Sequence, residues 1–214
     1  MSRVSVLKTI ADRIASLQPG HPVRVGIDGA DAAGKTTFAD ELAPVLAERG
    51  RPVVRASIDS FHHPAHLRYR RGSDSPEGYF LDSFDLISLR ALVLDPLGPG
   101  GSLEIRRAIF DFRLDRPVTV PAETIAPDAI LVFDGVFLHR DELFDCWEFS
   151  VFLEVDFETC VRRGEVRDAQ QFGSRERARA RYEQRYVPGQ KLYLAQCQPT
   201  LRASIVIQNG DATS

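Results

Sequence analysis

The sequence predicts an α/β protein with a doubly wound parallel sheet. Three observations predict it. Apolar runs of strand length alternate with segments of helical periodicity along the 214 residues. A glycine-containing turn at 29–36 joins a β-branched run to a helix start. The run 129–135 is apolar until it ends in an acid, which is typical of a strand buried on both faces. We expect a single domain over residues 1–214.

The predicted elements begin with an amphipathic helix. Apolar residues recur every three or four positions from Val4 to Leu17, and Pro19-Gly20 ends the pattern. A strand over 22–28, a helix from Thr36 toward Gly50 and a strand over 52–58 follow in that order. Because proline lacks an amide hydrogen, we expect Pro44 to kink the second helix or to end it early.

The middle of the chain is predicted to be less regular. A long turn-rich loop over 62–84, suited to face a substrate, precedes a helical pattern over 84–92. After a glycine-rich break at 97–101, strands over 103–106 and 117–120 are expected to form a small β insertion around 110–113.

The C-terminal part returns to the alternating pattern. Strands are predicted over 129–135, 149–155 and 203–207. Between the last two lies an arginine-rich helical segment at about 160–185, which we expect to act as a lid.

Residues 29–36 fit the pattern G-x-x-x-x-G-K-[ST] of a phosphate-binding loop. Between a strand and a helix N-terminus, such a loop surrounds an anion with backbone N–H groups and the positive helix end. An ordinary glycine-containing turn is the alternative, but the flanking strand and helix favour a nucleotide site. The sequence therefore predicts ATP and Mg²⁺ as cofactors. The residues expected to bind the nucleotide are Gly29, Ala30, Asp31, Ala32, Ala33, Gly34, Lys35, Thr36 and Thr37.

Phosphoryl transfer requires positioning, a metal ion and neutralisation of charge. Lys35 is expected to reach the β- and γ-phosphates, and the Thr36 hydroxyl to bind Mg²⁺. Asp134 ends the most apolar strand and is predicted as a second metal ligand, with a helix-capping role as the alternative. Asp59 follows the next strand and is expected to accept the proton of the acceptor hydroxyl, unless it merely starts a turn.

Two arginines of the lid-like segment are candidates for cations that close over the transferred phosphate. Arg163 and Arg167 are four residues apart and therefore share one face of the predicted helix. We predict a catalytic role for both. A solvated helix carrying Glu–Arg pairs is the alternative.

Aromatic and basic residues are predicted to contact the acceptor. These are His62, Tyr79, Phe110 and Arg113. The aromatic residues could instead belong to an ordinary core. A zinc site at His62, His63 and His66 is disfavoured, because Pro64 disrupts the helix that would align them and no H-E-x-x-H pattern is present.

The composition argues against several classes of protein. The chain is 43% hydrophobic and 27% charged, with no apolar run long enough to span a membrane and no signal peptide, so we expect it in the cytoplasm. The net charge of −3 argues against a nucleic-acid partner, which would require a broad cationic face. Three widely spaced cysteines indicate neither disulfides nor zinc. The expected partner is a small-molecule acceptor, and a homo-oligomer is compatible with the sequence.

Several stretches, in the same order along the chain, resemble the uridine kinase and phosphoribulokinase branch of P-loop kinases. They are Val25–Gly29 leading into Gly34–Thr37, Ser57–Phe61, Phe84-Asp85, Phe110–Phe112, Phe133–Gly135, Arg162-Arg163 with Arg167-Asp168, and Ala203–Ile207. The resemblance covers residues 23–210 and implies a P-loop kinase fold with Mg-ATP as phosphate donor. It implies that Asp59 is the catalytic aspartate and that the acceptor is a nucleoside such as uridine or cytidine.

The sequence departs from this family where the acceptor would be recognised. Uridine kinases typically carry a tyrosine and, a few residues on, a histidine that contacts the pyrimidine. Here Phe110 and Asp115-Arg116 stand at those places, and the loop over 75–80 also differs. Pantothenate, a sugar or another small alcohol therefore stays open as the acceptor.

Two other functional classes were compared with a kinase. A GTP-driven switch would carry an N-K-x-D motif, but the only asparagine is Asn209, followed by Gly210-Asp211. A nucleotide-binding regulator without transferase activity would keep the loop but would not need Asp59 or the arginine-rich segment. The regulator is retained as the alternative of a different class.

Overall fold

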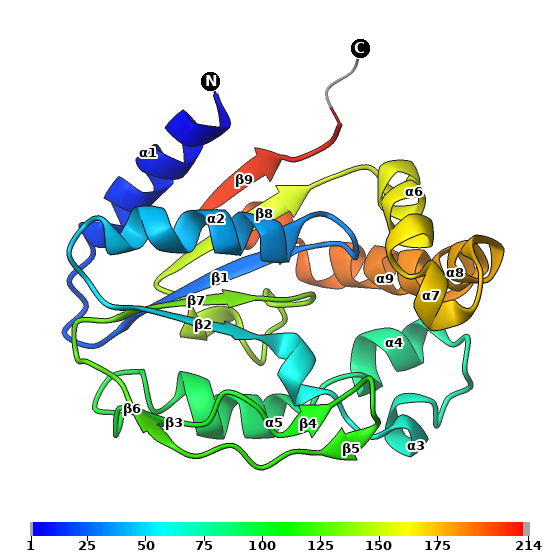
Figure 1. Ribbon diagram of the computed structural model, residues 1–214, viewed down its shortest axis with the longest axis horizontal. Helices are drawn as coiled ribbons and strands as arrows, with labels where there is room; N and C mark the ends of the chain where they lie inside the picture. Colours follow the sequence, from blue (N-terminus) through cyan, green and yellow to red (C-terminus); the bar gives the residue numbers. More distant parts are fainter. Residues whose placement is uncertain (1, 212–214) are drawn as a thin grey trace.

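The computed structural model describes residues 2–211, which form a central parallel sheet with helices on both faces (Figure 1). The strand order is β2-β7-β1-β8-β9, and every pairing within this sheet is parallel. The strands are β1 (Val23–Gly29), β2 (Val53–Ser57), β7 (Ile130–Asp134), β8 (Phe149–Glu154) and β9 (Ile205–Gln208). The predicted doubly wound α/β fold is thereby confirmed.

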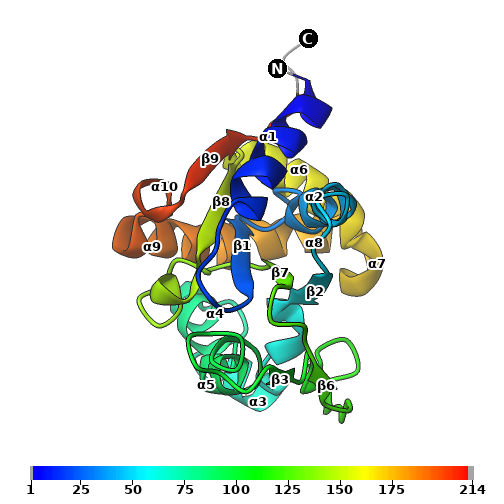
Figure 2. The same ribbon diagram turned by 90° about the vertical axis from the view of Figure 1, so that its left-hand side faces the viewer.

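Helices cover both faces of the sheet. On one face lie α1 (Arg3–Ala15), α2 (Lys35–Ala47) and the start of α6 (Phe157–Arg167); on the other lie α4 (Pro76–Asp82), α5 (Leu86–Leu89) and α9 (Val187–Cys197). Figure 2, turned by 90°, shows α1 and α5 on opposite sides of the strands. The remaining helical segments are η1 (Ile58–Phe61), α3 (Ala65–Arg68), η2 (Arg90–Leu94), η3 (Phe144–Cys146), α7 (Ala169–Phe172), α8 (Arg175–Arg181), η4 (Tyr182–Tyr186) and α10 (Pro199–Arg202).

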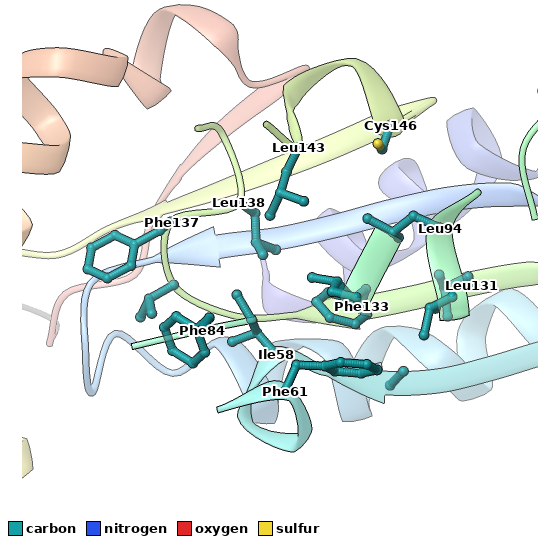
Figure 3. Packing of buried hydrophobic residues seen from close by; sticks show 14 of the residues in the cluster. Ile58, Phe61, Phe84, Leu94, Leu131, Phe133, Phe137, Leu138, Leu143 and Cys146 are labelled. Atoms are coloured by element: carbon teal, nitrogen blue, oxygen red, sulfur yellow. The ribbon is translucent and has the colours of Figure 1, made fainter. Parts of the chain in front are cut away.

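The central strands are buried on both faces, because successive side chains of a strand point in opposite directions. In β7, Ile130 and Val132 pack in the layer of α1 and α2. Leu131 and Phe133 of the same strand pack in the other layer, where Phe133 lies next to Ile58 (Figure 3). The sheet therefore lies between two hydrophobic cores. Because both cores pack against it, the carboxyl ends of its strands are fixed relative to each other.

Helix α2 continues past Pro44, so the early end expected at this proline is wrong. The helix ends at Ala47, and the amide of Glu48 still donates to the carbonyl oxygen of Pro44 at 3.1 Å. Leu42 and Leu46, on either side of the proline, are both fully buried. Burial of these two side chains stabilises the helix by more than the loss of the single hydrogen bond that the proline removes.

The β insertion is present, but its strands are shorter than expected. β3 (Glu104–Ile105) pairs with β6 (Glu123–Thr124), and β4 (Phe110–Asp111) pairs with β5 (Arg116–Pro117), both antiparallel. Of the strand predicted over 117–120, only Pro117 lies in β5. The Val118 amide still donates to the carbonyl oxygen of Ile109 at 2.9 Å, next to the paired residues.

The segment from 157 to 186 is helical, as expected, and consists of α6, α7, α8 and η4. Within residues 2–211, each helix is too short or too polar to cross a lipid bilayer.

Arg24 makes an ion pair inside the fold, at the opposite end of β1 from the glycine turn. Its guanidinium donates to Glu148 at 2.6 Å and to the carbonyl oxygen of Leu94 at 3.0 Å. The Arg24 amide also donates to the Glu148 carboxylate, at 2.7 Å. The Glu148 carboxylate therefore pairs with the buried Arg24 guanidinium and joins β1 to the start of β8.

We expect Glu148→Ala to lower the free energy of unfolding by about 3 kcal/mol, because it leaves the Arg24 charge buried without its partner. The measurement is denaturant unfolding, with Glu104→Ala as the control because Glu104 is an exposed acid of β3. The control should change stability by about 0.5 kcal/mol or less. Equal losses for the two variants would contradict this account of the ion pair.

Candidate active site

The carboxyl ends of three neighbouring strands meet at one edge of the sheet. Ile27 of β1 and Ser57 of β2 both pair with Asp134 of β7. The glycine turn follows Ile27 within two residues, and Asp59 follows Ser57 at the same distance along the chain. The structure thus brings together residues that the sequence places about a hundred positions apart, at the edge where open α/β sheets bind ligands.

The turn over 29–36 has the geometry of an anion-binding loop. Ala32 and Gly34 adopt positive φ angles of 59° and 89°, which turn successive N–H groups toward one side of the loop. Gly34 begins α2 and has no side chain to occupy the free N–H groups of the first helical turn. A methyl group on Gly34 would lie 2.9 Å from Nδ2 of Asn209, whose side chain would have to shift, while the positive φ itself favours glycine. Binding of a triphosphate by residues 29–37 stays a prediction.

Lys35 and Asn209 hold the outer side of this loop. The Lys35 ammonium donates to the carbonyl oxygen of Ala30 at 2.6 Å, so its side chain lies along the loop. The Asn209 amide donates to the carbonyl oxygen of Ala33 at 2.8 Å. Asn209 follows β9 at the end of the chain, and its role could not be found from the sequence pattern.

Thr36 and Asp134 meet directly, as their predicted shared role requires. The Thr36 hydroxyl donates to Oδ2 of Asp134 at 2.7 Å, and Asp134 is buried. The other oxygen, Oδ1, accepts a hydrogen bond from Arg55 at 2.9 Å. Two adjacent oxygen donors, one of them a carboxylate, are the ligand type that Mg²⁺ prefers. The sequence analysis did not predict this contact of Arg55. An arginine within a predicted strand could have indicated it, because such a side chain needs a partner.

Asp59 lies beside the loop, in the short helix η1 that follows β2. Burial raises the pKa of its carboxyl group above the ordinary value, against the lowering effect of the charges on His62 and Lys35. The charges of Asp134 and Asp31 act in the raising direction. Asp59 is nevertheless open to solvent, so protein atoms crowd the carboxyl group without covering it. A carboxylate with a raised pKa is a better proton acceptor near neutral pH.

Histidine and aromatic rings stand next to Asp59. Nδ1 of His62 lies 2.9 Å from the carbonyl oxygen of Asp59. Its ring stacks on Phe112 at a centroid distance of 4.7 Å and meets Phe84 at 4.4 Å. Burial lowers the pKa of His62, against the raising effect of the Asp59 charge. Two aromatic side chains that contact His62 therefore lie close to the candidate base.

The other residues predicted to contact the acceptor occupy different environments. Phe110 is buried in the β insertion, and Arg113 is exposed beside the ring of Phe112. Tyr79 is buried between Phe137 and Tyr186 and donates its hydroxyl hydrogen to a carboxylate of the glycine turn. Contact of these residues with an acceptor stays a prediction.

Arg163 and Arg167 hold partners within the protein. Arg163 donates to the carbonyl oxygen of Asn209 at 3.0 Å and to Asp211 at 2.7 Å. Arg167 donates to Asp168 at 2.8 Å and to the hydroxyl of Tyr182 at 3.0 Å. Arg167 is exposed, and its hydrogen bonds to Asp168 and the Asp168 charge raise its pKa, so the guanidinium is charged. To reach a phosphate, each arginine would have to exchange these partners.

A buried polar network that the sequence analysis missed supports the start of the loop. Oδ1 of Asp28 accepts from the Gly29 amide at 2.7 Å, and Oδ2 lies 2.6 Å from Nδ1 of His139 and also accepts from the Tyr193 hydroxyl. Nε2 of His139 lies 2.9 Å from the Ser150 hydroxyl. Asp28, His139 and Tyr193 are fully buried. The sequence signal that could have indicated this network is Asp28, an acid near the end of the apolar strand β1.

The hydrogen bonds of this network fit an imidazole that carries its hydrogen on Nδ1. The imidazole then donates to Asp28 and accepts the hydroxyl hydrogen of Ser150, while the Ser150 oxygen accepts from the Ser204 amide at 3.2 Å. Oδ2 of Asp28 accepts two hydrogen bonds, from His139 and from Tyr193. The Asp28–His139–Ser150 arrangement resembles a hydrolytic triad only in residue types, because its serine is buried and its hydroxyl is already bonded.

Comparisons with known proteins agree with this geometry. The model of the phosphoribulokinase / uridine kinase family matches residues 24–213. A uridine kinase of Leuconostoc citreum is 26% identical over 196 residues, which are 88% of this chain and 88% of that protein. The extent of the family match confirms the resemblance found in the sequence.

Solved structures show the same fold. A candidate uridine kinase from Bacillus stearothermophilus has a TM-score of 0.76 at 20% identity, over 97% of this chain and 100% of that one. A candidate fructose transport system kinase from Silicibacter has a TM-score of 0.78 at 21% identity, over 97% and 99%. At these identities the likeness establishes the architecture of a P-loop kinase and leaves the acceptor open.

We expect His139→Leu to lower the free energy of unfolding by about 2–3 kcal/mol, because the buried Asp28 carboxylate loses a hydrogen-bond donor. The check is denaturant unfolding beside His66→Leu, which alters an exposed histidine of α3. The His66 variant should change stability by about 0.5 kcal/mol or less. A His139 variant as stable as its control would show that the network does not support the loop.

Proposed function

We propose that this chain, which belongs to the phosphoribulokinase / uridine kinase family, transfers the γ-phosphoryl group of ATP to a hydroxyl of a small molecule. One observation carries the proposal. The glycine turn with Lys35, the Thr36–Asp134 pair and Asp59 lie together at one edge of the sheet. These are the positioning, metal-binding and proton-accepting parts that phosphoryl transfer needs.

The donor side consists of the loop and the start of α2. Backbone N–H groups of residues 29–37 would surround the phosphates, and Lys35 would leave the Ala30 carbonyl to contact the β- and γ-phosphates. Arg163 and Arg167 remain the proposed cations of the lid, with the exchange of partners described above.

Thr36 and Asp134 are the proposed ligands of Mg²⁺, which supplies charge neutralisation at the phosphates when bound. Their oxygens are 2.7 Å apart, close enough for both to belong to one coordination shell. Arg55 fixes the orientation of Asp134 through the second carboxylate oxygen. This arrangement would keep one oxygen of Asp134 directed at the metal position.

Asp59 is the proposed proton acceptor. Its carboxylate would take the proton of the acceptor hydroxyl while the hydroxyl oxygen forms its bond to phosphorus and ADP leaves. The raised pKa of Asp59 favours this role, because it makes the carboxylate a stronger base. Activity is expected to fall as the pH falls through that pKa and the carboxyl group becomes protonated.

The proposed acceptor is a nucleoside, with uridine or cytidine first. The rings of His62 and Phe112 next to Asp59 suit a flat base, and the relatives named above include a uridine kinase. Phe110 at the place of the usual tyrosine keeps a sugar, pantothenate or another small alcohol as the second candidate. We propose a cytoplasmic enzyme, supported by its composition.

A screen of uridine, cytidine, other nucleosides, pantothenate and sugars with Mg-ATP tests this proposal. ATP consumption that depends on one acceptor would identify it, and a sugar or pantothenate would replace the nucleoside. ATP hydrolysis that no alcohol stimulates would favour a nucleotide-binding regulator over a kinase.

We expect Asp59→Asn to lower kcat by about 10²–10⁴-fold while the affinity for Mg-ATP stays near that of the original protein, because only the proton acceptor is lost. Steady-state kinetics with the acceptor found in the screen provides the first number, and nucleotide titration the second. An unchanged kcat would remove Asp59 from the mechanism.

We expect Thr36→Ala and Asp134→Asn each to raise the Mg²⁺ concentration needed for half-maximal activity by about ten-fold or more, because each removes a metal ligand. Thr9→Ala, in the exposed part of α1, is the matched control and should leave this concentration unchanged. A Mg²⁺ requirement that is the same in all three variants would refute the assigned ligands.

A further inference from the structure

Asp31 places a negative charge inside the loop that is proposed to hold a triphosphate. Its oxygen Oδ2 accepts two hydrogen bonds, from the Tyr79 hydroxyl at 2.5 Å and from the Gln190 amide at 3.1 Å. Tyr79 belongs to α4 and Gln190 to α9, and both side chains are buried. Two separate helices therefore act on a single carboxylate oxygen.

Both anchoring helices lie on the sheet face opposite α2. Helix α2 packs in the core layer with α1, whereas Tyr79 of α4 and Tyr193 of α9 belong to the other core layer (Figure 1). The N–H groups that would bind phosphate include those at the start of α2, in the other layer. The two hydrogen bonds hold the Asp31 carboxylate toward the layer of α4 and α9.

The anchor is built into the packing of the two helices. A methyl group on Gly189 would lie 2.7 Å from Cδ1 of Tyr79 and 3.0 Å from the carbonyl oxygen of Pro76, so α4 and α9 touch at this glycine. The Tyr79 ring is further fixed by Phe137, at 5.0 Å between centroids, and by Tyr186, at 4.8 Å. Burial, followed by the charge of Asp31, holds the pKa of Tyr79 well above its ordinary value, so the hydroxyl stays a donor.

The hydrogen bonds of Tyr79 and Gln190 to Asp31 affect the electrostatics of the loop. A carboxylate and a triphosphate repel each other, and the repulsion is stronger where protein atoms displace water. Hydrogen bonds to an ionised carboxylate are short and strong, so two of them can fix its position and disperse part of its charge. Without them, Asp31 could turn toward the phosphates.

We propose that Tyr79 and Gln190 are positioning residues that hold the Asp31 carboxylate away from the triphosphate and thereby raise the affinity for Mg-ATP. The inference rests on the proposed function of the loop as a donor site. The affinity for Mg-ATP would then also depend on the packed position of α4, which belongs to the long segment that follows Asp59. If Tyr79 had only a structural role, the effect of removing its hydroxyl on Mg-ATP binding would not depend on the charge of Asp31.

A double-mutant cycle separates these two roles. The dissociation constant of Mg-ATP is measured by titration calorimetry for the original protein, Tyr79→Phe, Asp31→Asn and the double variant. We expect Tyr79→Phe to weaken binding by about five-fold or more, because the hydroxyl is lost while the ring stays packed. In the Asp31→Asn background the same substitution should change binding by about two-fold or less, because no carboxylate is left to repel the phosphates.

Tyr186→Phe is the matched control. Tyr186 packs against Tyr79, and its hydroxyl lacks a hydrogen bond to Asp31 within residues 2–211. Its removal should alter Mg-ATP binding by about two-fold or less. Gln190→Leu provides a second test of the anchor with the same expected pattern, and thermal unfolding confirms that each variant is folded.

Equal weakening by Tyr79→Phe in both backgrounds would overturn the inference, and so would unchanged binding. The proposed function fails in a different way. If the original protein does not bind Mg-ATP, or binds it as well after Lys35→Ala, the loop is not a donor site. If Lys35→Ala abolishes binding but the cycle shows no coupling, only the role of Tyr79 and Gln190 is refuted.

Discussion

The shape of the glycine turn is the constraint on which the rest of this structure depends. A loop that directs its N–H groups inward must find partners elsewhere for its carbonyl oxygens and side chains. Asn209 binds the carbonyl oxygen of Ala33, His139 binds Asp28, and Gln190 binds Asp31. Each partner comes from a segment more than a hundred residues further along the chain. The loop can therefore hold its shape only when the C-terminal half has packed around it.

The order of strands explains how that packing reaches the loop. β1 lies in the middle of the sheet, between β7 and β8, so its end is surrounded on both sides. β7 delivers Asp134 to Thr36, and β2, on the far side of β7, delivers Asp59. A parallel sheet buried on both faces fixes these ends firmly, because each strand is held by two hydrophobic layers. Rigid placement of this kind is what phosphoryl transfer asks of a protein.

The proposed acceptor side is built differently. Short helices and two-residue strands replace long elements between residues 58 and 125, and side-chain contacts hold them together. His62 bonds the Asp59 backbone and stacks on Phe112, which joins η1 to the β insertion. Such segments change more readily than a central sheet. Members of one kinase family can therefore share the donor side and differ in the acceptor, as the departures at Phe110 and residues 115–116 indicate for this chain.

The sequence by itself determined the strand and helix pattern, the glycine turn and the meeting of Thr36, Asp134 and Asp59 at one sheet edge, because periodicity, local turn chemistry and parallel topology specify them. Local rules failed at Pro44, where buried leucines on both sides keep α2 helical, and in the β insertion, where the strands are shorter than expected. Only the tertiary structure decided the bonds of Arg55 to Asp134 and of Tyr79 to Asp31, the buried network of His139 and the partners of Arg163 and Arg167. The bonds of Arg55 to Asp134, of Tyr79 to Asp31, of His139 to Asp28 and of Arg163 to Asn209 each join residues at least 46 positions apart, and a long-range contact leaves no pattern in the local sequence.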